Sequence, residues 1–159
     1  MTALTGTEGI GNAGQGEAVF ISPDGSTAFV GGPSDNSNKG AVWVYDLKSG
    51  SPVQQAKLVP NDGVGDYGSA FGEAISSDKK GNRVVIGGGS DSNGKGAVWI
   101  FERKNGVWRQ VGLKIKGTRA NGRMGSAVAM TWDGGTFVTS VGPDGSTGRG
   151  SVYVYQRLR

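Results

Sequence analysis

The heptapeptide Lys-Gly-Ala-Val-Trp-Val-Tyr, residues 39–45, decides the fold because the chain repeats it. It returns as Lys-Gly-Ala-Val-Trp-Ile-Phe at residues 95–101 and, more loosely, as Arg-Gly-Ser-Val-Tyr-Val-Tyr at residues 149–155. The copies start 56 and then 54 residues apart. Self-similarity at such a period indicates a repeat architecture, in which each copy is one structural unit.

Each copy predicts a β-strand that is covered on both faces. A cation and a glycine end the preceding loop, and the side chains then alternate with a period of two. Val42 and Val44 point to one side of the strand, whereas Ala41, Trp43 and Tyr45 point to the other. Since both sides are apolar, the strand is expected to lie between two other layers of structure.

Composition agrees with an all-β protein. The chain has 159 residues, the length of one domain or of one part of a larger assembly. It contains 31 glycines and 5 prolines, which recur in register with the expected strands and are therefore interpreted as turn residues. No segment repeats apolar residues at the spacing of an amphipathic helix.

Charge and residue usage exclude several classes of function. The formal net charge of +4 is mild and spread along the chain, so a nucleic-acid partner is not expected. The absence of cysteine and histidine excludes disulfides, thiolate metal sites and the usual general base. No apolar run resembles a signal peptide or a membrane span, so membrane insertion is not expected either.

Each repeat is expected to contain four strands in the same order. In the first repeat they lie at residues 17–22, 27–31, around Trp43, and 53–59. In the second they lie at residues 69–76, 83–87, 96–102 and 107–115. The third repeat has strands near 125–131, 136–140 and 149–156, and its fourth strand is missing.

The missing strand has a counterpart at the other end of the chain. The segment Ala3-Leu4-Thr5-Gly6 aligns with residues 57–60 and 114–117. Ring-shaped propellers often close in this way, with both termini completing one blade. The predicted organisation is therefore an outer-strand stub (1–6), blade 1 (7–59), blade 2 (60–115), and blade 3 without its outer strand (116–159).

The repeats resemble the FG-GAP repeats of integrin-α-type β-propellers and their bacterial and viral relatives. Phe71-Gly72 supplies the literal signature before one innermost strand, and Gly16 and Gly125 stand at the matching places. Gly31-Gly32-Pro33 and Gly142-Pro143 supply its second half. The resemblance covers almost the whole chain and implies four-stranded antiparallel blades around a central axis. It also favours an extracellular, cell-surface or virion location.

Three blades do not close a ring, because propellers have at least about four. We therefore expect the chain to assemble with itself, as a homodimer with six blades or a homotrimer with nine. Closure would set Ala3, Leu4 and Thr5 of one subunit beside Val152 and Val154 of the next. The structural alternative is a β-trefoil, which also has three repeats but closes as a monomer and buries mainly one face of each strand.

No metal, cofactor or catalytic centre is expected. Many FG-GAP repeats carry a calcium loop of alternating Asp or Asn, and calcium requires six to eight oxygen ligands. The matching turns hold one carboxylate each, at Asp24, Asp78 and Asp133, and are interpreted as hairpin turns. Asp62 and Asp66 form a possible carboxylate pair, but Asn61-Asp62-Gly63 is first a turn signal. The protein is therefore expected not to be an enzyme.

The long loops on one rim of the predicted propeller are the candidate binding surface. Their candidate ligand-binding residues are Asp35, Lys39, Tyr67, Asp91, Lys95, Arg119, Arg123 and Arg149. The same residues can instead organise the loops and flank the strands. Two functions remain open: a structural or adhesive, protein-binding module, or a lectin-like module that binds glycans on this rim. Trp43 and Trp99 look buried in strands, which leaves few aromatic residues for a sugar.

Overall fold

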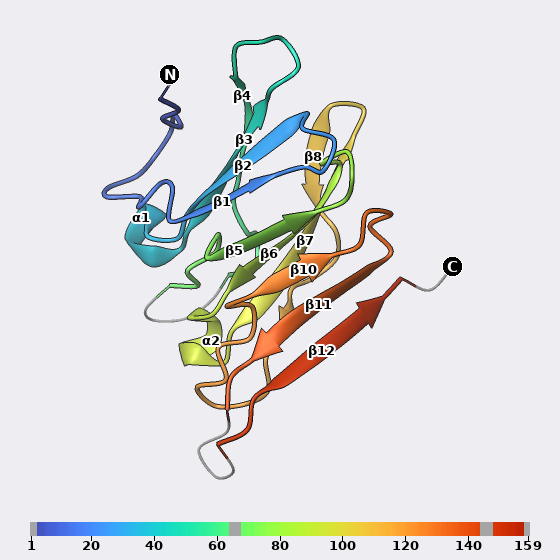
Figure 1. Ribbon diagram of the computed structural model, residues 1–159. Helices are drawn as coiled ribbons and strands as arrows, with labels where there is room; N and C mark the ends of the chain where they lie inside the picture. Colours follow the sequence, from blue (N-terminus) through green and yellow to red (C-terminus); the bar gives the residue numbers. More distant parts are fainter. Residues whose placement is uncertain (1–2, 64–67, 144–147, 158–159) are drawn as a thin grey trace.

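The computed structural model describes residues 3–63, 68–143 and 148–157, and its strands form three antiparallel sheets (Figure 1). The first sheet, blade 1, contains β1 (Ala18–Ile21), β2 (Thr27–Gly32), β3 (Ala41–Asp46) and β4 (Val53–Leu58) in that order. These strands confirm the order predicted for the first repeat. Hairpin connections join consecutive strands, because each turn is built from local glycine, proline and aspartate signals.

Blade 2 repeats this order with β5 (Ala74–Ser77), β6 (Arg83–Gly88), β7 (Ala97–Lys104) and β8 (Val107–Gln110). The prediction of a single fourth strand at 107–115 is wrong, because this segment forms two separate strands. A short strand, β9 (Ile115–Lys116), pairs separately with the beginning of β7. The chain leaves the ladder between β8 and β9, where Gly112 has a positive φ and the Lys114 N–H binds Asp62 instead of β7.

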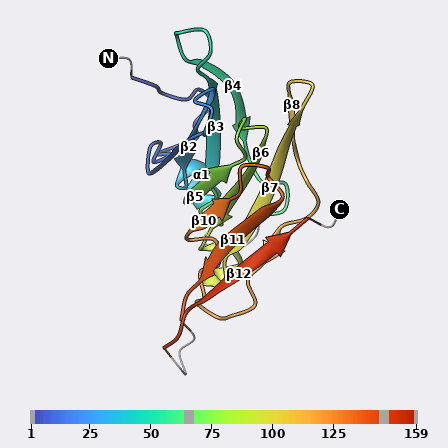
Figure 2. The ribbon, with the colours of Figure 1, turned by 45° about the vertical axis from the view of Figure 1, so that its right-hand side comes forward.

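Blade 3 contains β10 (Val128–Met130), β11 (Thr136–Val141) and β12 (Ser151–Gln156). Among the described residues β12 has no neighbour on its outer edge, as predicted for a blade without its fourth strand. The three blades lie side by side, and the inner strand of blade 2, β5, contacts the inner strands of both other blades, β1 and β10 (Figure 2).

In the part of the chain that the structure describes, two helical turns interrupt the loops between the second and third strands of a blade. They are α1 (Asp35–Asn38) and α2 (Asp91–Gly94). Their central residues, Asn36 with Ser37 and Ser92 with Asn93, have positive φ and ψ, so the turns are left-handed. Asn tolerates this conformation better than most residues because its short side chain bonds locally. The sequence predicted polar loops here without this turn.

The main cores lie between the blades. One face of each blade, its forward face, is turned towards the next blade in the chain, and its rear face is turned towards the preceding one. Val42 and Val44 on the forward face of blade 1 pack with Trp99 on the rear face of blade 2. Phe71 fills the space between them, with its ring 5.4 Å from that of Trp99 in an edge-to-face arrangement. A second core joins Val98 of blade 2 to blade 3.

Strands covered on both faces were predicted, and this prediction is confirmed for β3 and β7. Trp43 and Trp99 are 0% and 1% exposed. The cover of Trp43 comes from the N-terminal segment, because Ala13 and Leu4 pack against its cluster. The Trp43 indole N–H donates to the carbonyl oxygen of Thr7 at 2.6 Å.

Candidate binding surfaces

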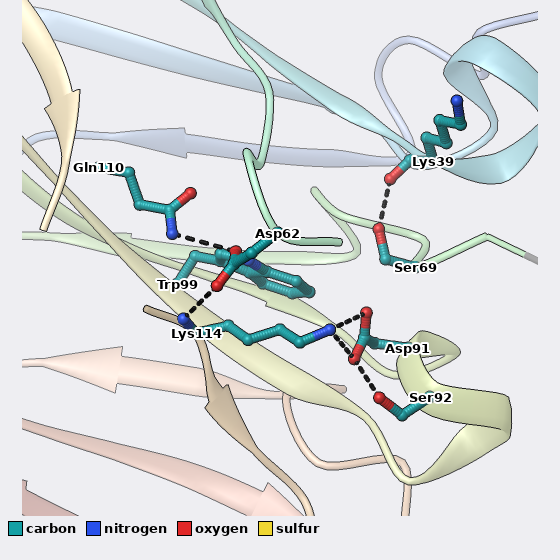
Figure 3. Close-up of polar contacts among 8 residues, drawn as sticks. All are labelled: Lys39, Asp62, Ser69, Asp91, Ser92, Trp99, Gln110 and Lys114. Atoms are coloured by element: carbon teal, nitrogen blue, oxygen red, sulfur yellow. Dashed lines mark hydrogen bonds and ion pairs between the residues drawn. The ribbon is translucent and has the colours of Figure 1, made fainter. Parts of the chain in front are cut away.

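A buried ion pair lies beside the α2 turn of blade 2 (Figure 3). Lys114 Nζ lies 2.8 and 2.6 Å from the two carboxylate oxygens of Asp91, and these side chains are only 2% and 0% exposed. The Ser92 hydroxyl donates to the same carboxylate at 2.7 Å, and the ammonium group lies 5.7 Å from the centre of the Trp99 ring. The pair therefore fastens the α2 turn to the segment just before β9.

Blade 1 contains the equivalent pair. Lys57 Nζ lies 2.8 Å from Asp35 Oδ2 and 5.2 Å from the centre of the Trp43 ring. The Ile10 N–H donates to the other oxygen, Asp35 Oδ1, at 2.7 Å. Asp35 and Asp91 were candidate ligand-binding residues. The structure places both in ion pairs, which hold α1 to β4 through Lys57 and α2 to the segment just before β9 through Lys114. This is the loop-organising role.

Asp62 ties the connection between blades 1 and 2 to blade 2. Its carboxylate accepts hydrogen bonds from the Trp99 indole at 2.8 Å, the Gln110 amide at 3.0 Å and the Lys114 N–H at 2.8 Å (Figure 3). Burial alone would raise the pKa of Asp62, but these hydrogen bonds outweigh it and hold the pKa below its ordinary value. Asp62 is therefore engaged as a structural acceptor. Asp66, its possible partner, lies outside the described residues.

The candidate cations Lys39 and Lys95 have exposed side chains directly after α1 and α2. The backbone carbonyl of Lys39 accepts a hydrogen bond from the Ser69 hydroxyl at 2.6 Å, which joins the α1 loop to the next blade (Figure 3). The two ammonium groups stand on equivalent positions of neighbouring blades and remain available to solvent.

The candidate arginines are mostly engaged within the rim. Arg123 forms an ion pair with Glu73 at 2.6 Å, across the junction of blades 2 and 3. Arg119 donates to the carbonyl oxygens of Gly142 at 3.0 Å and Arg149 at 3.2 Å. Arg149 itself has an exposed side chain. Tyr67, the remaining candidate, lies outside the described residues.

A pocket of about 390 Å³ opens on the rim between blades 1 and 2. Its lining combines the Asp35–Lys57 pair and Lys39 with the apolar side chains of Ile10 and Val59. It thus brings together two of the predicted site residues, Asp35 and Lys39. A small polar ligand in this pocket would meet both charged groups and aliphatic carbon.

The turn carboxylates hydrogen-bond within their own turns. Asp24 accepts from the Ser22 hydroxyl at 2.8 Å and the Ser26 N–H at 2.9 Å. Hydrogen bonding by Ser26 and Ser22 lowers the pKa of Asp24 to about 2. Asp133 accepts from the Thr131 hydroxyl in the same manner. Within residues 3–63, 68–143 and 148–157, no group of three or more potential metal ligands is present.

The forward face of blade 3 is an open apolar surface. Val152 and Val154 on β12 are 64% and 62% exposed. Val42 and Val98, which occupy the register position of Val152 in β3 and β7, are 0% exposed because the next blade covers them. The two valines predicted to take part in closure therefore lie on an open face of blade 3. The equivalent faces of blades 1 and 2 are covered by the next blade.

The rear face of blade 1 is open in part. Val19 and Ile21 on β1 are 72% and 59% exposed. Farther out, the stub predicted to pair with another subunit runs beside its own blade: Leu4 is half-buried against the Trp43 cluster, while Ala3 and Thr5 are exposed. Of the three stub residues predicted to take part in closure, Leu4 alone packs against its own blade in this way.

One exposed aromatic residue was not among the predicted site residues. Trp132 is 67% exposed on the turn between β10 and β11, with Lys79 Nζ 5.8 Å from the centre of its ring. Its position immediately before the Asp133-Gly134 turn signal could have identified it as a residue at a loop tip.

The helices of the described part of the chain are all too short and too polar to cross a membrane.

Comparison of the sequence with protein-family models and with curated proteins found no match. The structure is similar to that of TolB from Acinetobacter baumannii, with a TM-score of 0.50 and 16% sequence identity over 90% of this chain and 30% of TolB. It is also similar to the β-propeller domain of Cps50 (Swd1) from Myceliophteria thermophila, with a TM-score of 0.54 and 14% identity over 93% of this chain and 41% of that one.

These similarities establish the fold at the level of β-propeller blades. They support the predicted propeller over the β-trefoil alternative. The chain spans less than half the length of either solved structure. The resemblance to FG-GAP repeats in particular stays a prediction, since neither similarity bears on it.

Proposed function

We propose that this protein is a non-enzymatic structural module of propeller blades that binds protein through the forward face of blade 3, and that its partner is a second copy of the chain. One observation carries the proposal. Val152 is 64% exposed, although the equivalent valines of the two other blades are completely covered. An apolar sheet face that its neighbours bury is an interaction surface when it lies open.

The size of this face predicts a weak, concentration-dependent contact. Its strands β10, β11 and β12 contain three, six and six residues, and at about 3.3 Å per residue and about 4.8 Å between strands they cover roughly 240 Å². Covering such a face on two copies would contribute up to about 12 kcal/mol at ~25 cal/mol per Å². Association itself costs an estimated 4–15 kcal/mol. The association cost is of the same order as this upper bound on the gain, so the net affinity should be modest and the complex should dissociate on dilution.

Sedimentation or light scattering over a wide range of protein concentration tests the proposal. The wild-type chain should gain mass with concentration, and Val154→Lys should abolish the gain by placing a charge in the contact. Val107→Lys is the matched control, because Val107 is 52% exposed on β8, away from the forward face of blade 3. A wild-type chain that stays monomeric at every concentration refutes the proposed function.

Two geometries satisfy this proposal. In the ring expected from the sequence, the forward face of one copy meets the rear face of another, giving six blades in a dimer or nine in a trimer. Leu58 and Ile115 lie opposite Val42 and Val98, so Leu4 would lie opposite Val152 of the next subunit. In the second geometry, two forward faces meet around a twofold axis.

Glycan binding on the rim is a second candidate function, favoured by the pocket between blades 1 and 2. The pocket combines charged groups with aliphatic carbon, but aromatic side chains, on which sugars commonly stack, are absent from its described lining. A glycan array followed by titration calorimetry tests this function. Binding that is lost in Lys39→Ala and retained in Lys95→Ala would support it, and a blank array would exclude it for the glycans presented.

A further inference from the structure

Both internal junctions depend on a glycine that touches the backbone of the next blade. These glycines are Gly31 in β2 and Gly87 in β6, which pair with Val42 and Val98 respectively. A Cβ atom on Gly31 would overlap the carbonyl oxygen of Gly72, and one on Gly87 would overlap that of Gly125. Neighbouring blades can approach this closely only because both positions lack a side chain.

Blade 3 has a side chain at the same position. Ser140 in β11 pairs with Val152, in the register that Gly31 and Gly87 have with their valines. Its hydroxyl accepts a hydrogen bond from the Ala127 N–H at 3.0 Å, so it has a structural role in its own sheet. A further blade docked with the internal spacing would drive a carbonyl oxygen into Ser140.

The other end of the chain also departs from the internal pattern. Phe71 and Met124 precede the innermost strands of blades 2 and 3, are 0% exposed, and pack in the cores at the two junctions. Blade 1 has Gln15 at this position. Its amide is occupied, since it accepts from the Gly6 N–H at 2.6 Å and donates to the Gly6 carbonyl at 3.0 Å. If the rear face of blade 1 docked on another subunit to close a ring, the polar Gln15 amide would be desolvated. The two internal junctions have an apolar side chain at this position.

We infer that two copies of the chain meet through the forward faces of their third blades, around a twofold axis, and do not close a ring. This inference rests on the proposed function and specifies its geometry. The side chains that form the face carry no charge, so the surface is compatible with itself: Ala127, Ala129, Val138, Ser140, Val152 and Val154. Ser140 is acceptable here because sheets packed face to face keep their backbones about 10 Å apart.

The register of the strands locates the centre of the contact. Val138 lies in the middle strand of blade 3, between its partners Ala129 in β10 and Val154 in β12. A twofold axis through the middle of this face passes near Val138. The same side chain of both copies therefore comes together there, which cannot happen in a head-to-tail ring.

Cysteine cross-linking distinguishes the geometries, because the chain has no cysteine of its own. Val138→Cys and Val154→Cys are each treated alone with a short bismaleimide. Val19→Cys, on the rear face of blade 1, and Val107→Cys, on β8, are the controls. Val154→Cys is also mixed with Val19→Cys. Because Val154 is exposed, its substitution should leave the fold unchanged, which near-ultraviolet circular dichroism verifies.

We expect covalent dimers from Val138→Cys or Val154→Cys alone, and none from Val19→Cys or Val107→Cys. A dimer that forms only in the mixture of Val154→Cys with Val19→Cys would indicate the ring; it would overturn this inference and leave the proposed function standing. If none of these samples forms a covalent dimer and the wild-type chain is monomeric, both fail together. Dimers from Val107→Cys alone would locate the contact elsewhere and also overturn the inference.

Discussion

Replacing Gly87 by alanine should separate blades 2 and 3. In an ordinary strand position this change stabilises a protein by about 0.4–1 kcal/mol, because alanine restricts the unfolded chain. At Gly87 the new Cβ atom would overlap the carbonyl oxygen of Gly125 and lie 2.7 Å from its carbonyl carbon and 3.0 Å from its Cα. All three atoms belong to the backbone, so no side chain can rotate away. The blades themselves must move apart.

The magnitude follows from what that movement disturbs. Overpacking a tight core costs about 1–3 kcal/mol. The cluster of Val85, Val98, Met124, Phe137 and Val141 spans this junction, so its contacts weaken as well. We expect a loss of about 3 kcal/mol in the free energy of unfolding. With a urea m-value of about 2 kcal/mol per M, the midpoint should fall by about 1.5 M.

Urea unfolding followed by tryptophan fluorescence measures this change. Ser140→Ala is the comparison at the equivalent position of blade 3. It keeps the Cβ atom and loses only the hydrogen bonds between the hydroxyl and the backbone of Ala127, so it should cost about 1 kcal/mol. If Gly87→Ala is as stable as wild type or more so, the backbones do not touch at this junction, and the argument built on Ser140 fails with it.

Three further changes test other parts of the structure. Lys114→Met should cost about 3–5 kcal/mol by leaving the buried Asp91 carboxylate without its ammonium partner, and Asp91→Asn in the same chain should recover part of this loss in urea unfolding. Trp99→Ala should cost about 3–5 kcal/mol by emptying the core between blades 1 and 2; an innocuous loss would show that the ring is not buried in solution. Asp24 should titrate near pH 2 by NMR. Because its folded-state pKa is lowered, its small stabilising contribution is present above about pH 4 and disappears as the pH falls through 2, and Asp24→Asn should remove that part of the pH dependence. Titration near pH 4 would mean that its turn hydrogen bonds do not form in solution.

The strands could be predicted because their signals are local. Alternation in the Trp43 strand, turns such as Pro23-Asp24-Gly25, and the repeat period all lie within short segments. The left-handed turns α1 and α2 were not predicted. The break between β8 and β9 was not predicted either, because it depends on Asp62, about fifty residues away, which draws the Lys114 N–H out of the ladder.

The candidate rim was predicted from equivalent positions alone, and equivalence cannot tell a ligand-binding charge from a paired one. Asp35 and Asp91 were selected because they match each other, but each is neutralised by a lysine, Lys57 on β4 and Lys114 just before β9. Lys57 and Lys114 also occupy equivalent positions in the two repeats. This second equivalence could have revealed that each aspartate has a lysine partner. The sequence also contains Ser140 where the other repeats have glycine. The importance of this difference depends on how closely the backbone of a neighbouring blade approaches, which the sequence does not reveal.

The placement of the cores between blades has a consequence for how the chain folds during synthesis. Blade 1 alone leaves Val42 and Val44 uncovered on its forward face, since Phe71 and Trp99 of blade 2 complete the cluster that buries them. We therefore expect the first unit that folds cooperatively to be a pair of blades, which is complete only when the chain has left the ribosome as far as β9. Blade 3 then adds to a template that already exists, as a new repeat adds to a linear array of repeats.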